Sequence, residues 1–186
     1  MESKGILLDA DILSHFMASG REDLLPSIFQ GHILMLVDQV YQEASHVPGE
    51  PGRKAALDRW MNTHSVFRLA FPSDLSLDVV DEYFRLKAEH PCLGKGERAC
   101  LSIARYYHDV IASSNFRDVA AYCNIHEIEY LGMLDILWIG IRNGSLTEAE
   151  ADVIIDMAIQ KDNARFPVRY IRDYLPGKKL NAWVQG

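Results

Sequence analysis

Short apolar runs alternate with amphipathic stretches along this chain. Runs of this length that are rich in Ile, Leu and Val are typical of strands buried on both faces, whereas apolar residues at intervals of three and four predict helices. The expected strands cover residues 5–8, 33–37, 66–71, 110–112 and 127–130. The regular alternation of such strands with helices predicts an α/β fold, with a central parallel twisted sheet flanked by helices in three layers.

The helices between these strands have recognisable starts and stops. Thr147 with Glu150 three residues later is typical of a capping box at a helix start, and His90-Pro91 is expected to end a helix over residues 76–89. In that helix the apolar residues expected to face inward are Leu77, Val80, Tyr83, Phe84 and Leu86. Further helices are expected over residues 24–29, 54–62, 133–142 and 148–160, after the first two strands, and from Gly94 to about Arg105.

Length and composition indicate one domain. A chain of 186 residues and 21.1 kDa, 48% apolar, is long enough to bury a sizeable core. We expect the domain to span residues 1–165 and the tail, 166–186, to pack on it. The net charge of −7 opposes non-specific attraction to phosphate backbones, so a nucleic-acid role requires a local basic surface or bound cations.

The cysteines and the N-terminal residues indicate the cellular compartment of the protein. Cys92, Cys100 and Cys123 are odd in number and have no CxxC spacing, which favours reduced thiols used for packing. Asp9 and Asp11 interrupt the region where a secretory signal would be apolar, and no other run is long enough to cross a bilayer. The sequence therefore predicts a soluble cytoplasmic protein without a membrane partner.

Four acidic residues stand at boundaries between the expected strands and helices: Asp9, Glu43, Glu97 and Asp118. Each alone has an ordinary explanation, since an acid caps a helix or favours its first turn. Together they suggest more, because parallel topology brings the segments beyond the strand ends into one crevice.

Carboxylates that lie close together repel one another unless protons or cations neutralise them. Oxygen ligands without zinc-type Cys or His spacing favour Mg²⁺ or Mn²⁺. Two such ions, typically about 3.5–4 Å apart, promote phosphodiester hydrolysis by activating water and stabilising the leaving oxygen.

At this point the sequence resembles the PIN-domain nucleases, which include the toxin ribonucleases of type II toxin–antitoxin pairs. The resemblance runs from Gly5 to about Arg165. The segments that carry it are Leu7-Leu8-Asp9-Ala10-Asp11, Val40-Tyr41-Gln42-Glu43, Gly96-Glu97-Arg98-Ala99, Ser113-Ser114-Asn115-Phe116-Arg117-Asp118, and the helical stretches that begin at Gly132 and Gly144.

This resemblance implies a PIN-like fold and cleavage of RNA by a metal-dependent ribonuclease. Asp9, Glu43, Glu97 and Asp118 would be the catalytic acids, and Asp9, Glu97 and Asp118 would hold Mg²⁺ or Mn²⁺. An antitoxin protein and a second copy in a homodimer are the partners that it suggests.

The chain departs from the family pattern at two places. Asp11 stands where many members have a small polar residue, so a fifth carboxylate either joins the site or points away. Asn115 stands where many members have an acid, which leaves Asn115, Asp118 or both as the last ligand.

Three neighbouring side chains are additional candidates. Arg98 and Arg117 are candidates for phosphate contacts because a guanidinium matches phosphate oxygens, although a surface ion pair with a neighbouring acid is the preferred explanation of each. Ser113 is expected either to orient water at the metal or to cap a helix.

Two other functions fit parts of the pattern. A PIN-like domain without catalytic activity would use the acids to bind a partner's arginines, as a scaffold. Asp9-Ala10-Asp11 also satisfies the DxD of haloacid-dehalogenase-type phosphatases, but those enzymes usually continue with Gly-Thr, whereas this chain continues with Ile12-Leu13.

Overall fold

Five parallel strands form the centre of the structure, a computed structural model that describes residues 3–184 apart from the side chains of residues 116–118. The strands are β1 (Gly5–Leu8), β2 (Ile33–Val37), β3 (Phe67–Leu69), β4 (Val110–Ala112) and β5 (Tyr130–Leu131), in the order β3-β2-β1-β4-β5. In the centre, Ile6 of β1 pairs with Leu34 of β2 on one side and with Val110 of β4 on the other. These central strands are buried because helices cover both faces of the sheet, as their continuous apolar runs predict.

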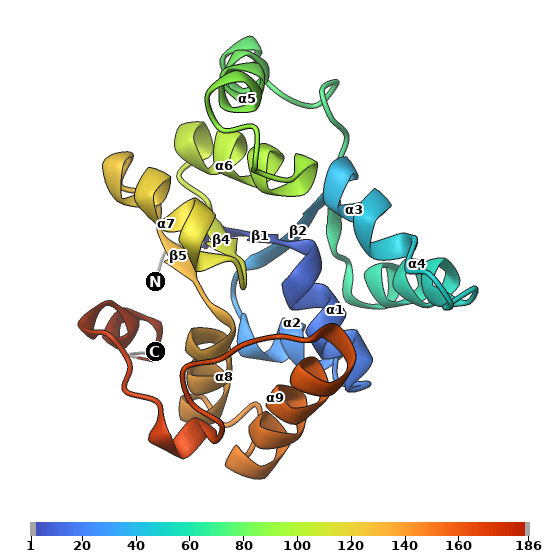
Figure 1. Ribbon diagram of the computed structural model, residues 1–186, viewed down its shortest axis with the longest axis vertical. Helices are drawn as coiled ribbons and strands as arrows, with labels where there is room; N and C mark the ends of the chain where they lie inside the picture. The colour runs from blue at the N-terminus through green and yellow to red at the C-terminus, as the bar shows by residue number, and fades with distance from the viewer. Residues whose placement is uncertain (1–2, 185–186) are drawn as a thin grey trace.

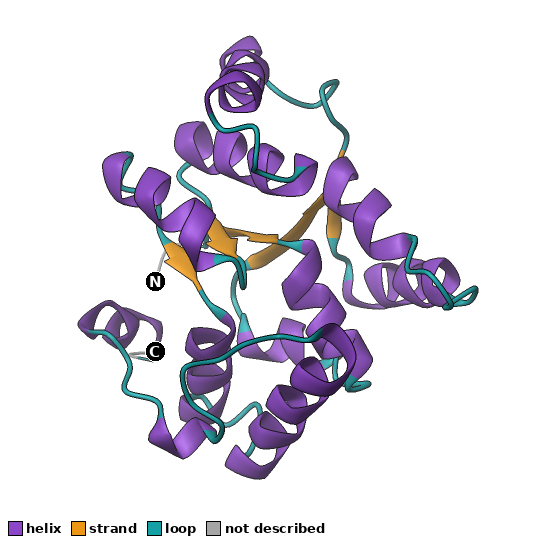
Figure 2. Ribbon diagram, in the orientation of Figure 1, coloured by secondary structure: helices purple, strands orange, loops and turns teal. Residues whose placement is uncertain are grey.

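Helices surround the sheet in two outer layers (Figures 1 and 2). They are α1 (Ala10–Ala18), α2 (Leu24–Ile28), α3 (Asp38–Ser45), α4 (Arg53–His64), α5 (Leu77–Glu89), α6 (Lys95–Tyr107), α7 (Phe116–Ile125), α8 (Met133–Arg142) and α9 (Glu148–Asp162). Figure 1 shows α6 and α7 on one side of the sheet, with α5 outside α6, and α1, α2, α8 and α9 on the other. The expected α/β fold with a helix-flanked parallel sheet is confirmed.

The predicted helix starts also have a clear physical basis. The Thr147 hydroxyl accepts a hydrogen bond from the Glu150 amide at 3.2 Å, and the Glu150 carboxylate accepts one from the Thr147 amide at 2.9 Å. The predicted capping box is therefore confirmed at the start of α9.

The last strand begins later than predicted. The chain still turns at Glu127, whose φ of 54° is left-handed, and the Ile128 amide donates to the Cys123 carbonyl at 2.8 Å. Residues 127 and 128 therefore complete the turn that ends α7, and β5 is limited to Tyr130 and Leu131.

The predicted inner face of α5 is wrong in part. Leu77 and Phe84 are 81% and 55% exposed, whereas Val79 is buried. The helix is rotated because Glu82 is also buried, where Arg105 of α6 forms an ion pair with its carboxylate at 2.7 Å. The inner face of α5 thus includes the polar residue Glu82, which a prediction from apolar residues alone leaves out.

The tail after α9 packs against α8 and α9 through two short 3-10 helices, Ile171–Asp173 and Lys178–Trp183. Ile171 and Leu180 are buried, and the Ile171 amide donates to the Asp152 carboxylate at 2.8 Å. Cys100 and Cys123 are buried but Cys92 is exposed, so the expected packing role fails for Cys92. Over residues 3–184, no helix is both long and apolar enough to span a membrane.

Candidate active site at the carboxyl edge of the sheet

The candidate site lies beyond the carboxyl ends of β1 and β4. Strand β1 lies between β2 and β4. The chain continues from β1 to β2, on one side of β1, and later returns to form β4 on the other side of β1. Open parallel sheets bind ligands at such a switch point, because the loops beyond the two strands separate there. Asp9 directly follows β1, and its backbone amide donates to the Ala112 carbonyl at the end of β4 at 2.9 Å.

Asp9 is held on both carboxylate oxygens. Its Oδ1 accepts a hydrogen bond from the Ala10 amide at 2.8 Å, which makes Asp9 the N-cap of α1. Its Oδ2 accepts one from the Ser113 hydroxyl at 2.8 Å, and the side chain is nearly inaccessible, since Asp9 is only 4% exposed. The capping role and the proposed chemical role therefore use the same carboxylate.

The loop after β4 connects Asp9 to Glu97. The Asn115 backbone amide donates to the Ser113 hydroxyl at 3.1 Å, and the Asn115 side-chain Nδ2 donates to Glu97 Oε1 at 2.7 Å. The other Glu97 oxygen accepts from the Gly94 amide at 2.7 Å, at the start of α6. The first turn of α6 lies at the carboxyl edge because α6 runs back across the sheet before β4 begins. Glu97 is therefore close enough to Asp9 for its charge to raise the pKa of Asp9. We call the region between these carboxylates the acidic crevice.

Glu43 reaches the site from α3. Its Oε1 accepts a hydrogen bond from the Gly96 amide at 3.3 Å. A Cβ atom at Gly96 would lie 2.8 Å from Glu43 Oε2 and 2.9 Å from Val40 Cγ2, both too close for van der Waals contact. Only glycine therefore lets the first turn of α6 approach α3 this closely.

The acids repel one another in this crevice. Burial, together with the negative charges of Asp11 and Glu97, raises the pKa of Asp9 from 3.8 to about 7, although the hydrogen bonds from Ser113 and Ala10 oppose the rise. Partial burial, with the charges of Glu97 and Asp11, also raises the pKa of Glu43. Asp11, an exposed residue, therefore acts electrostatically on the site.

A buried thiol below the site experiences the same charges. Burial raises the pKa of Cys100 on α6, and the negative charges of Asp9, Glu43 and Glu97 raise it further. Among the described residues, no Lys, Arg or His forms an ion pair with any of these carboxylates. The crevice thus concentrates negative charge without a paired cation.

The donor atoms fit a hard divalent cation. All side-chain atoms that face the crevice from Asp9, Glu43, Glu97 and Ser113 are oxygens, the ligands that Mg²⁺ and Mn²⁺ prefer. In the described part of the chain, no three His, Cys, Asp or Glu side chains are close enough to hold a metal as they stand. As they stand, these carboxylates are held by hydrogen bonds from Gly94, Ser113 and Asn115.

The other predicted residues are placed differently. Arg117 and Asp118 lie on α7, and their side chains are outside the described residues. Arg98 is buried, donates to the Leu93 carbonyl and lies with its guanidinium carbon 5.5 Å from the Tyr83 ring centroid. It faces α5 rather than the carboxylates, so the expected phosphate contact of Arg98 is not supported.

Sequence reasoning missed one wall of the site. A cavity of about 440 Å³ lies beside Asp11 and Asn115, and its far wall is the segment that follows α9. The residues that line it are Asp11, Ser14, His15, Ser114, Asn115, Asp162, Asn163, Ala164, Arg165 and Phe166. Residues 163–166 have no periodic pattern, and no local signal relates them to Asp11.

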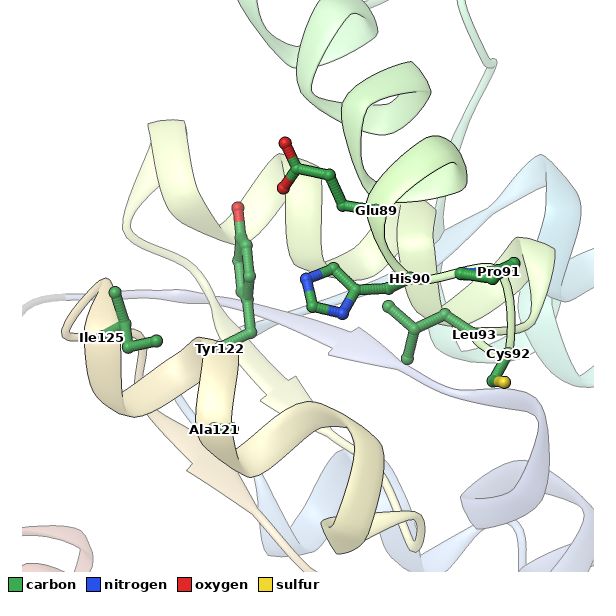
Figure 3. A pocket seen from close by; sticks show the side chains of 8 residues that line it. All are labelled: Glu89, His90, Pro91, Cys92, Leu93, Ala121, Tyr122 and Ile125. Atoms are coloured by element: carbon green, nitrogen blue, oxygen red, sulfur yellow. The ribbon is translucent and has the colours of Figure 1, made fainter.

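A second cavity, of about 370 Å³, lies between α7 and the loop that follows α5 (Figure 3). Glu89, His90 and Cys92 line it, residue types that also occur in catalytic sites. Figure 3 shows the Glu89 carboxylate and the Cys92 sulfur pointing in different directions, and Arg85 holds Glu89 in an ion pair. The side chains do not converge on one point, so this cavity is not the candidate active site.

The geometry thus rests on Asp9, Glu43 and Glu97. Ser113 and Asn115 connect Asp9 to Glu97, and the Gly96 amide connects Glu43 to α6. The parallel sheet flanked by helices agrees with the fold class that the PIN-domain resemblance implies, and the family and its metal site stay predictions. Comparison with models of protein families, with curated proteins and with solved structures finds no match to this chain.

Proposed function

We propose that the protein is a metal-dependent ribonuclease that hydrolyses phosphodiester bonds of RNA. One observation carries the proposal: Asp9, Glu43 and Glu97 converge on one crevice at the carboxyl edge of the sheet, and no described basic side chain forms an ion pair with them. Such a cluster persists most readily where a cation neutralises it. A scaffold fold has no comparable need for a buried carboxylate whose pKa is near 7.

Each side chain has a separate task in this proposal. Asp9 and Glu97 would hold Mg²⁺ or Mn²⁺ with Glu43 beside them, and Asp118 would join them if its side chain faces the crevice. Ser113 orients Asp9, and Asn115 orients Glu97. When bound, the metal would lower the pKa of water and neutralise charge that develops on the phosphate oxygens.

Hydrolysis requires that one bond forms and one breaks at phosphorus. Water adds its oxygen to phosphorus and gives up a proton, the bond from phosphorus to the leaving ribose oxygen breaks, and that oxygen takes up a proton directly or through solvent. The acids of the crevice must be ionised to hold the cation, so Asp9 must lose its proton before the site is loaded.

Cleavage of a generic single-stranded RNA with Mg²⁺ or Mn²⁺ tests the proposal. We expect Asp9→Asn and Glu97→Gln each to lower the rate by more than the roughly 10- to 100-fold that loss of an outer partner of a metal site costs. Glu148→Gln is the matched control, because Glu148 is exposed at the start of α9 and lines no described cavity. Its rate should equal that of the wild type.

Three outcomes separate the alternatives. Loss of cleavage in both site variants, with folding preserved, supports catalysis by the crevice. Equal cleavage by the wild type and both variants identifies a contaminating nuclease. No cleavage by the purified wild type under any divalent metal favours the scaffold, whose acids bind a partner's arginines.

A further inference from the structure

The cavity beside the acids has room for a ligand larger than a metal ion. It joins Asp11 and Asn115, which belong to the acidic crevice, to the segment after α9. Its volume of about 440 Å³ lies within the range of small-molecule sites, which is about 300–1,000 Å³. A ligand in this cavity therefore lies directly next to the proposed reaction centre.

The far wall is fixed to α1 by specific contacts. His15 Nδ1 lies 2.6 Å from Asp162 Oδ2, and the His15 ring meets the Phe166 ring edge-on with centroids 6.1 Å apart. Lys161 donates to the Ala18 carbonyl at 2.8 Å. Asn163, with a left-handed φ of 54°, ends α9 and turns the chain over the cavity. The wall is thus ordered before any ligand arrives.

Arg165 supplies this wall with a free positive charge. It is exposed, lines the cavity, and forms no ion pair or hydrogen bond with any described residue. Arg68 pairs with Asp38 at 2.7 Å and Arg21 with Glu150 at 3.8 Å, whereas Arg165 has no carboxylate partner among the described residues. An unpaired guanidinium beside an acidic crevice is suited to a polyanion that the acids alone would repel.

The Ser114 hydroxyl is a second unsatisfied group on the cavity. It lines the cavity between Asn115 and Arg165, and its oxygen is buried without a hydrogen-bond partner among the described residues. Buried polar atoms are usually paired, so an unpaired one beside a cavity points to a polar ligand.

We infer that this cavity binds the nucleotide adjacent to the cleaved phosphodiester, with Arg165 holding its phosphate and the edge of Phe166 contacting its sugar or base. The inference rests on the proposed function, because it assigns a second contact to the same RNA strand. Arg165 binds substrate and does not take part in bond breaking. It replaces Arg98 as the chain's phosphate-binding arginine.

Binding of a fluorescein-labelled single-stranded RNA tests this role without cleavage. The background is Asp9→Asn, which is expected not to cut, and the variants on it are Arg165→Ala, Arg165→Lys and Arg59→Ala. Each phosphate contact to a single strand contributes about 0.7 to the slope of log affinity against log salt. We expect Arg165→Ala to weaken binding and reduce that slope by about 0.7, with Arg165→Lys keeping most of the slope.

Arg59 is the matched control, because it is exposed on α4, carries the same charge and lines no described cavity. Equal slopes for Arg165→Ala and Arg59→Ala would overturn the inference. In the cleaving protein, Arg165→Ala should raise KM with little change in kcat, whereas an unchanged KM would also overturn it.

The two proposals fail in different ways. If the wild type cleaves RNA and Arg165→Ala has the same RNA affinity and KM, the nucleotide-binding role of the cavity is wrong and the ribonuclease proposal stands. A wild type that never cleaves but binds RNA through Arg165 removes the ribonuclease and keeps the cavity only as an RNA-binding site. A wild type that neither cleaves nor binds RNA removes both.

Discussion

Replacing Asp9 by asparagine should abolish cleavage and, without metal, stabilise the fold. A carboxyl whose pKa is raised in the folded state binds its proton more tightly there than in the unfolded chain. Its contribution to stability is therefore fully present below pH 3.8 and is lost as the pH rises toward about 7. Above pH 7 the folded protein carries a buried charge that asparagine would remove.

The expected size follows from the pKa and the hydrogen bonds. Each pKa unit corresponds to about 1.4 kcal/mol, so the rise from 3.8 to about 7 corresponds to roughly 4 kcal/mol. Asparagine can still accept from the Ala10 amide, but Ser113 loses the acceptor of its hydroxyl, which costs about 1–3 kcal/mol. The net gain at pH 8 is therefore about 1–3 kcal/mol.

Urea unfolding in a chelator at pH 8 and pH 5 measures this gain. The advantage of Asp9→Asn should be largest at pH 8 and smaller at pH 5, where the wild-type Asp9 is protonated. Saturating Mn²⁺ should reverse the order, since a ligand at 100 times its Kd stabilises the wild type by about 2.7 kcal/mol. An Asp9→Asn protein less stable than the wild type at pH 8 without metal would show that the buried charge of Asp9 does not destabilise the fold.

Three further predictions concern the rest of the crevice and the cell. Ser113→Ala removes a hydrogen bond that lowers the pKa of Asp9, so the acidic limb of the cleavage pH profile should move to higher pH; an unmoved limb would exclude this role. Gly96→Ala should lower stability by about 1–3 kcal/mol in thermal unfolding, because its Cβ would collide with Val40 and Glu43, and an unchanged Tm would contradict the close approach. If the protein is a toxin, expression should arrest bacterial growth and Asp9→Asn should not; growth equal to that of the variant would count against a toxin.

The sheet was predictable because its strands are marked in the sequence. Residues 5–8, 33–37 and 110–112 are short apolar runs, and the structure has strands with these bounds. The spacing of apolar residues alone did not determine the orientation of α5, because the buried Glu82 forms an ion pair with Arg105 of another helix. Such a pair depends on tertiary packing that the local pattern does not contain.

The crevice was predictable in outline for a similar reason. Asp9 follows a strand and Glu97 begins a helix that returns to the same edge, so parallel topology places both there. The contacts that join them, from Ser113 and Asn115, follow from the loop after β4. The closeness of Gly96 to Glu43 depends on how α3 packs against α6, and no motif marks it.

The arginines show where the prediction failed. Successive residues of a helix are rotated by about 100°, so when Glu97 points toward the crevice, Arg98 points to one side of it. This direction was available from the sequence. The position of Arg165 was not, because it depends on the contact of His15 with Asp162, residues far apart in the chain.

Crystals soaked in Mn²⁺ show whether Asp9 and Glu97 share a cation, because anomalous scattering locates the ion independently of activity. We expect a peak in the crevice with carboxylate oxygens of Asp9 and Glu97 at about 2.1 Å from it. The soak uses an Mn²⁺ concentration that saturates cleavage in solution. If the crevice then shows no anomalous density, Asp9 and Glu97 do not share a cation, and the proposed chemistry is wrong.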